Sequence, residues 1–127
     1  MSQTEKRALH IRIKQFGEEH PKTADSYHSI GATQHSLMDY TAALESDKRA
    51  LHIRIKQFGE EHPNTADSYH LIGVTQHSLM DYTAALESEK RALHIRIKLF
   101  GEEHPKTADS YRSVWYLKSL TSSFVHS

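Results

Sequence analysis

Histidine is the residue type in this sequence with the clearest capacity for chemistry. Eleven of the 127 residues are histidine, and ten of these lie in segments that recur along the chain. Imidazoles together with the carboxylates of Asp25 and Asp67 are ligand types that Zn²⁺ or Ni²⁺ accepts. However, His28 and His35 are two helical turns apart, about 10.5 Å along a helix axis. One ion would therefore need ligands from adjacent segments, and we predict no metal site.

A second group of chemically capable residues, Glu18–Glu19–His20, has the composition of acid–base machinery. The same three residues recur at 60–62 and 102–104, and a group repeated in equivalent turns is typical of a solvated helix end. The chain has no cysteine and no glycine-rich phosphate loop, and no Ser–His–Asp arrangement stands out. We therefore predict no enzymatic activity and no cofactor.

The composition excludes several classes of partner. Acidic and basic residues balance at 16 each, so no net field attracts nucleic acid or a membrane surface. No stretch approaches the roughly 20 apolar residues of a membrane-spanning helix, and the N-terminal sequence MSQTEKRALHIRIK lacks the apolar core of a signal peptide. The absence of cysteine fits a reducing compartment. We expect a cytoplasmic protein that binds neither nucleic acid nor membrane.

The chain is built from a repeated unit of 42 residues. The string ALHIRIKQFGEEHP occupies 8–21 and 50–63, and it returns at 92–105 with Leu99 in place of glutamine. The segments 5–46 and 47–88 differ at only four aligned pairs, which are Glu5/Asp47, Lys22/Asn64, Ser29/Leu71 and Ala32/Val74. The third copy departs from the pattern after Val114. A period of this length is typical of a solenoid of stacked units.

Each unit contains two helical patterns joined by turn residues. Apolar residues recur at helical spacing in TADSYHSIGATQHSL and again from Tyr40 to Phe58. Asp39 and Asp81 are placed to cap the second helix, Gly59 to end it, and Pro63 to begin the next one. Small residues such as Gly31 indicate close helix approach. We predict one all-α repeat domain over 1–127 with about six helices: a leading half-unit helix (4–17), a first hairpin (22–58), a second hairpin (64–100) and a trailing half-unit helix with a divergent tail (106–127).

The pattern within one unit resembles the tetratricopeptide repeat. The residues that carry the resemblance are Tyr27, Ile30–Gly31, Asp39–Tyr40, Ala43 and Ala50. The 42-residue period and the linker FGEEHPxTADSY are similar to the long-unit subclass found in kinesin light chains and nephrocystin-type proteins. The resemblance implies an α-solenoid of stacked antiparallel hairpins in a right-handed superhelix. It also implies a protein-interaction scaffold whose concave groove binds a peptide or a partner protein.

The sequence departs from the family pattern at polar and methionine positions. Met38 and Met80 stand where the family usually has a turn glycine, so either the turn is remodelled or the first helix runs on. Polar side chains stand at two positions where the family often has aromatic residues, and we expect these side chains to be partly exposed to solvent. They are Gln34, Gln76, Asp47 and Glu89.

The resemblance also indicates which residues face the groove, on the first helix of each unit. They are Asp25, His28, Ala32, His35 and Ser36, then Asp67, His70, Val74, His77 and Ser78, with Arg112 and Tyr116 extending the surface. The Lys and Asn that grip chaperone C-terminal carboxylates in this family are absent, which argues against such a clamp. Because histidine titrates near pH 6.5, we expect groove binding to change between about pH 5.5 and 7.5.

The two ends of the repeat array raise an alternative function, which is self-assembly. The leading helix keeps the apolar stripe of an interior helix, including Leu9, Ile13 and Phe16, and no pairing helix follows the last repeat in this sequence. Trp115, at the glycine position of the earlier copies, is expected to cap this face together with Val114, Leu117, Leu120 and Phe124. Otherwise the two end helices associate head-to-tail between copies, although the bulk of Trp115 argues against completing the missing hairpin unchanged.

Overall fold

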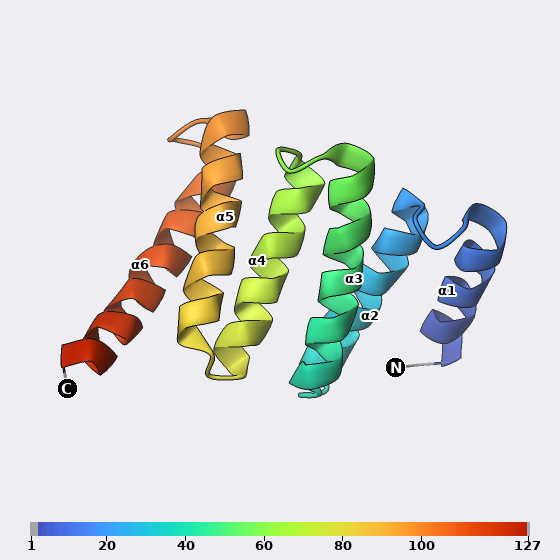
Figure 1. The fold of residues 1–127 in the computed structure, drawn as a ribbon, viewed down its shortest axis with the longest axis horizontal. Coiled ribbons are helices and arrows are strands. Elements are labelled where there is room, and N and C mark those ends of the chain that lie inside the picture. The colour runs from blue at the N-terminus through green and yellow to red at the C-terminus, as the bar shows by residue number, and fades with distance from the viewer. Residues whose placement is uncertain (1–2, 127) are drawn as a thin grey trace. The chain divides into compact units, whose positions relative to one another are not determined.

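A computed structural model describes residues 3–126, with side chains described through residue 122. In this range the chain forms six α-helices and no strand, which confirms the all-α solenoid prediction. They are α1 (Gln3–Phe16), α2 (Pro21–Ser36), α3 (Tyr40–Phe58), α4 (Pro63–Ser78), α5 (Tyr82–Phe100) and α6 (Pro105–His126) (Figure 1). None of the described helices combines the length and apolarity that crossing a membrane requires.

The helices fall into two compact units, which are called unit 1 (up to Gly59) and unit 2 (from Glu60). In unit 1, α2 packs against both α1 and α3. In unit 2, α5 packs against both α4 and α6. Residues 42 positions apart are equivalent in the repeat. That the two units form one domain stays a prediction.

The even-numbered helices begin with a histidine cap and a proline. Pro21 and Pro63 are the first helical residues of α2 and α4, where the missing N–H is not needed. The Nδ1 atoms of His20 and His62 accept the backbone N–H of the residue two positions on, each at 3.0 Å. His104 repeats this contact before α6, at 3.1 Å. The histidine of each Glu–Glu–His turn is therefore an N-cap, and not only part of a solvated helix end.

The odd-numbered helices end at glycine, as predicted. Gly59 has φ 90° and donates its N–H to Ile55 O at 2.8 Å. At the N-terminal ends of the same helices the Asp side chains behave unequally. Asp81 accepts from the N–H of Ala84 at 3.4 Å, whereas Asp39 makes no capping bond with its side chain. The side-chain cap prediction is therefore confirmed for Asp81 and wrong for Asp39.

The turn within each hairpin keeps a left-handed residue even though glycine is absent. Met38 has φ 64° and Met80 has φ 62°. In the first hairpin, Asp39 N–H donates to Gln34 O and Met38 N–H donates to His35 O, both at 2.9 Å. This pair of bonds is the Schellman arrangement that ends a helix. The helix therefore does not run on, and methionine occupies a conformation that glycine adopts at lower cost.

The centre of each hairpin is lined by small residues and contains buried polar groups. Ala24, Ala43 and Ala50 are buried in unit 1, and a Cβ added to Gly31 would overlap Asp47 Oδ1. This confirms the predicted close approach of α2 and α3. Close approach leaves room for little more than a methyl group.

The prediction that the departing polar side chains are partly exposed is wrong. Gln34, Gln76, Asp47 and Glu89 are all buried. Ser46 Oγ donates to Gln34 Oε1 at 2.7 Å, and Ser88 Oγ donates to Gln76 Oε1 at 2.6 Å. Each buried amide thus receives a hydrogen bond from a serine on the partner helix. These bonds offset the cost of removing the amide oxygens from water.

Candidate binding groove

The groove residues expected in unit 1 lie on α2, and two of them are held by one arginine. Arg54 Nη2 donates to Asp25 Oδ1 at 3.2 Å, and Arg54 Nη1 lies 3.1 Å from His28 Nδ1. Because a guanidinium can only donate, His28 Nδ1 is the acceptor. Of the other three expected residues, Ala32 and Ser36 are exposed. The half-buried His35 ring lies 5.0 Å from the Tyr40 ring.

In unit 2 the equivalent aspartate and histidine have different partners. Asp67 Oδ1 accepts from Arg96 Nη2 at 3.1 Å and lies 3.5 Å from Lys106 Nζ. His70 Nδ1 instead lies 3.0 and 3.1 Å from the two carboxylate oxygens of Glu89. A carboxylate accepts and does not donate, so in this contact His70 Nδ1 donates to the carboxylate of Glu89. The same residue type thus accepts in unit 1 and donates in unit 2.

Unit 2 contains a pocket of about 120 Å³, which is called the unit-2 pocket. Its lining comes from α4, α5 and α6: Gly73, Val74, His77, Glu89, Ser113, Tyr116 and Leu117. The pocket therefore joins Val74 and His77, which were predicted to face the groove, to the extension residue Tyr116. The His77 ring stands 5.8 Å from the Tyr116 ring and 5.5 Å from the Tyr82 ring, which fixes one wall.

Four residues of this pocket were not predicted to face the groove: Gly73, Glu89, Ser113 and Leu117. Glu89 was expected to be partly exposed, but it is only 2% exposed and is one of the residues that line the pocket. The available signal was Gly73, because a Cβ there would lie 2.7 Å from both Glu89 Cγ and Oε1. Four expected residues of unit 2 do not line the pocket: Asp67 and His70, whose partners are given above, and also Ser78 and Arg112. Ser78 is half-buried near the end of α4, and Arg112 pairs with Asp109 on its own helix.

A second surface, open and repeated, lies beside the odd-numbered helices. A hollow of about 570 Å³ in unit 1 and one of about 550 Å³ in unit 2 are lined by equivalent residues. In unit 2 these are Glu60, Glu61, Tyr69, Glu87, Lys90, Arg91, His94 and Ile95. Acidic and basic side chains mix in both hollows, so neither favours a ligand of one charge.

Three residues that line these hollows have shifted pKa values. The hydrogen bond from Lys56 lowers the pKa of Glu19, and the one from Lys98 lowers the pKa of Glu61. Burial, followed by the hydrogen bond to Glu60 at 3.1 Å, raises the pKa of Tyr69.

Tyr111, outside the lining of both hollows, has a raised pKa for a similar reason. The hydrogen bond from the Tyr111 hydroxyl to Glu102, at 2.6 Å, raises the pKa of Tyr111. Tyr69 and Tyr111 are equivalent positions, and each places its phenol against a glutamate of the preceding turn. Neither tyrosine lines the unit-2 pocket.

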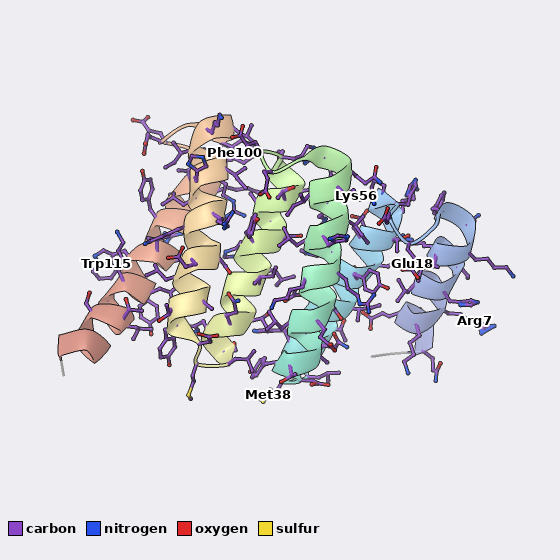
Figure 2. All side chains as sticks on the ribbon, in the orientation of Figure 1. Arg7, Glu18, Met38, Lys56, Phe100 and Trp115 are labelled. Atoms are coloured by element: carbon purple, nitrogen blue, oxygen red, sulfur yellow. The ribbon has the colours of Figure 1, made fainter. Side chains whose placement is uncertain are left out.

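The prediction that Trp115 caps the apolar face of the last helix is wrong. Val114 and Leu117 are buried, whereas Trp115 is 73% exposed and stands clear on α6 (Figure 2). Trp115 therefore does not cover them. Leu120 is half-buried, and the Phe124 side chain lies outside the described residues. On α1, Leu9 and Ile13 are half-buried and Phe16 is exposed.

Candidate metal ligands do not converge in the part of the chain that the structure describes. No three side chains of histidine, cysteine, aspartate or glutamate come together there as a metal site would need. Of the groove histidines, His28 contacts Arg54 and His70 contacts Glu89. Their geometry is that of hydrogen-bonded pairs.

Comparison with known proteins identifies the repeat. A family profile described as tetratricopeptide repeat matches residues 30–98, more than half of the chain. The crystal structure of BtubC (BKLC) from P. vanneervenii superposes with a TM-score of 0.86 at 24% identity, covering 94% of this chain and 48% of that one. A putative kinesin light chain structure from Podosopora anserina with nearly identical TPR-like repeats gives 0.82 at 21% identity, covering 89% and 54%.

These likenesses concern the fold. The chain spans about half the length of the solved structures it matches, and a search of curated protein sequences finds no match. The profile match and the helix-hairpin architecture agree with the resemblance drawn from Tyr27, Gly31 and Ala43. The chain therefore belongs to the tetratricopeptide repeat family.

Proposed function

We propose that this chain binds a peptide segment of a partner protein through the groove along its even-numbered helices. Tetratricopeptide repeats generally mediate protein–protein interactions and are generally non-enzymatic scaffolds. The observation that carries the proposal is the unit-2 pocket. There, Val74 and His77 meet Ser113 and Tyr116 around one concave site. A pocket of about 120 Å³ is smaller than a typical small-molecule site of roughly 300–1,000 Å³, and suits one side chain of a longer ligand.

The fixed polar side chains around this site favour binding. Arg96, itself buried, holds Asp67, and Glu89 holds His70. Side chains already ordered in the free protein do not lose that freedom when a partner binds, and each such loss costs about 0.5–1.5 kcal/mol. The groove of unit 2 is therefore preorganised.

The test is a peptide selection followed by a matched pair of variants. Peptides are selected from a random library on the immobilised chain, and affinities are measured by isothermal titration calorimetry. Val74→Arg fills the pocket and is expected to abolish binding. Ser119→Arg adds the same charge at an exposed α6 position outside the pocket lining, and is expected to leave binding intact. Selected peptides that bind both variants equally would contradict the proposal.

The expected pH dependence is measured in the same titration between about pH 5.5 and 7.5. His70 opposite Glu89 and His28 beside Arg54 are the groove histidines with charged partners. A proton added to either imidazole would place a positive charge beside Arg54 in unit 1 or beside Glu89 in unit 2. Binding is therefore expected to change over this range, and a flat profile would contradict a histidine role.

A second candidate function, head-to-tail self-association, is favoured by comparing equivalent positions. Ile53 is 4% exposed against α2, but the equivalent Ile11 on α1 is 51% exposed. Tyr69 is 8% exposed, but the equivalent Tyr111 on α6 is 41% exposed. The face that α3 packs against α2 is thus open at the equivalent position of α1, and the face that α4 packs against α5 is open at the equivalent position of α6. A second copy would bury both through a heterologous contact.

Light scattering after size exclusion, at two concentrations tenfold apart, tests self-association. If copies associate, the molar mass rises with concentration, and Ile11→Glu and Tyr111→Glu each return it to the monomer value. A constant monomer mass would refute this candidate and leave the groove proposal standing. The cytoplasmic location stays a prediction, which imaging of a fluorescent fusion would check.

A further inference from the structure

We propose that the unit-2 pocket is a subsite for a lysine side chain of the bound partner. The inference rests on the proposed groove function and specifies the chemistry of its anchor. The lining of the unit-2 pocket is apolar over most of its surface. Val74, Leu117 and the ring of Tyr116 supply apolar contacts, and Glu89 supplies the one carboxylate. An alkyl stem that ends in a cation is the side chain that matches this division.

Glu89 is the acidic residue of the unit-2 pocket. The residue is 2% exposed, and a buried carboxylate is costly unless cations or hydrogen-bond donors surround it. In the described part of the chain, both Glu89 oxygens contact the same nitrogen, His70 Nδ1. One N–H cannot use the roughly four acceptor positions of a carboxylate. An ammonium entering from the pocket would therefore find acceptor capacity that His70 leaves unused.

The shape of the site selects the kind of cation. A metal ion would need several ligands, and no cluster of three candidate ligands occurs among the described residues. A guanidinium pairs best with both oxygens of a carboxylate side by side, and here His70 already lies beside both. A lysine ammonium is compact and needs only one oxygen. The neighbouring Tyr116 ring adds a face that attracts cations.

Gly73 leaves room for the Glu89 side chain beside α4. Because glycine has no side chain, Glu89 lies against the α4 backbone, with Cγ and Oε1 each 2.7 Å from the place a Cβ would occupy. A larger residue there would displace the carboxylate from the pocket wall. The equivalent glycine in unit 1 faces Asp47, whose side chain is one methylene shorter. Glu89 lines the unit-2 pocket, and the lysine subsite is therefore assigned to unit 2.

The experiment uses three capped pentapeptides of alanine whose central residue is lysine, norleucine or arginine. Norleucine keeps the alkyl stem and lacks the ammonium. Binding is followed by amide chemical shifts of Gly73, Val74 and Tyr116 in ¹⁵N–¹H spectra of the full chain. We expect the lysine peptide to shift these resonances and to bind about tenfold more tightly than the norleucine peptide, as the loss of one charge-assisted hydrogen bond implies.

One variant changes Glu89, and two variants at other positions keep the test valid if that change disturbs folding. Glu89→Gln is expected to remove the preference for lysine over norleucine. Val74→Lys places an ammonium of the chain itself at the pocket and is expected to block the lysine peptide, while Ser119→Lys leaves it bound. Equal binding of lysine and norleucine, tighter binding of arginine, or no shift at the pocket would each overturn the lysine assignment. Library peptides without lysine that are still lost on Val74→Arg would overturn it too, and would leave the groove function in place.

Discussion

Replacing Gly73 with alanine tests whether Glu89 lies against α4 as the structure has it. The added Cβ would stand 2.7 Å from Glu89 Cγ and Oε1 and 3.0 Å from Cδ, about 1 Å closer than a comfortable carbon contact. Glu89 is buried and cannot move into solvent without leaving His70. Overpacking of this kind costs about 1–3 kcal/mol, and alanine returns about 1 kcal/mol of helix propensity. We expect a net loss of about 1 kcal/mol, and at most about 2 kcal/mol.

A double-mutant cycle separates the clash from other effects. Unfolding in urea is followed by far-ultraviolet circular dichroism for the wild type, Gly73→Ala, Glu89→Ala and the double variant. Without the Glu89 side chain the clash is gone, so Gly73→Ala is expected to stabilise the Glu89→Ala background by up to about 1 kcal/mol through propensity alone. The coupling energy between the two positions is then about 1–3 kcal/mol. Equal effects of Gly73→Ala in both backgrounds would refute the packing argument.

Three further predictions test local features. Met80→Gly removes a non-glycine residue from φ 62° at an exposed turn, and the melting temperature is expected to rise because relief of about 1–2 kcal/mol of strain exceeds the entropy that glycine adds to the unfolded chain; an unchanged or lower value would contradict this. His62→Ala removes the Nδ1 acceptor before α4 and is expected to cost about 1 kcal/mol, whereas His62→Asn retains a capping oxygen and most of the stability; equal losses would contradict the cap. Glu102→Gln is expected to lower the pKa of Tyr111, which the bond to Glu102 raises, towards the ordinary tyrosine value of about 10. Because the folded-state pKa is raised, the stabilisation is present below that ordinary value and is lost as pH rises through the folded pKa; ultraviolet titration of the two proteins measures the difference, and coincident curves would count against the bond.

The fold was predictable because each repeat states its helix ends in the sequence. Pro63 begins α4 and Gly59 ends α3 in the left-handed region, and Gly31 marks the crossing with α3. These residues act through backbone conformation and size, which a sequence shows directly. The repetition at 42 residues supplied the same evidence more than once.

The polar interior was not predictable in the same way. Gln34 and Asp47 read as exposed because hydropathy alone places polar residues at the surface. Their burial depends on partners on the other helix of the hairpin, such as Ser46, whose hydroxyl meets Gln34. His62 was missed as a cap because histidine is not among the favoured N-cap residues. Its position directly before a proline was the signal.

The two groove histidines show how near-identical repeats acquire different chemistry. In unit 1, Arg54 Nη1 reaches His28, so this imidazole accepts. In unit 2, the equivalent Arg96 Nη1 donates to Ser110 Oγ on α6 at 2.9 Å, and His70 meets Glu89 instead. The acid that His70 contacts also differs between the copies, because Glu89 stands where unit 1 has Asp47, whose side chain is one methylene shorter. The hydrogen-bonding role of one of these histidines therefore cannot be inferred from its equivalent in the other unit.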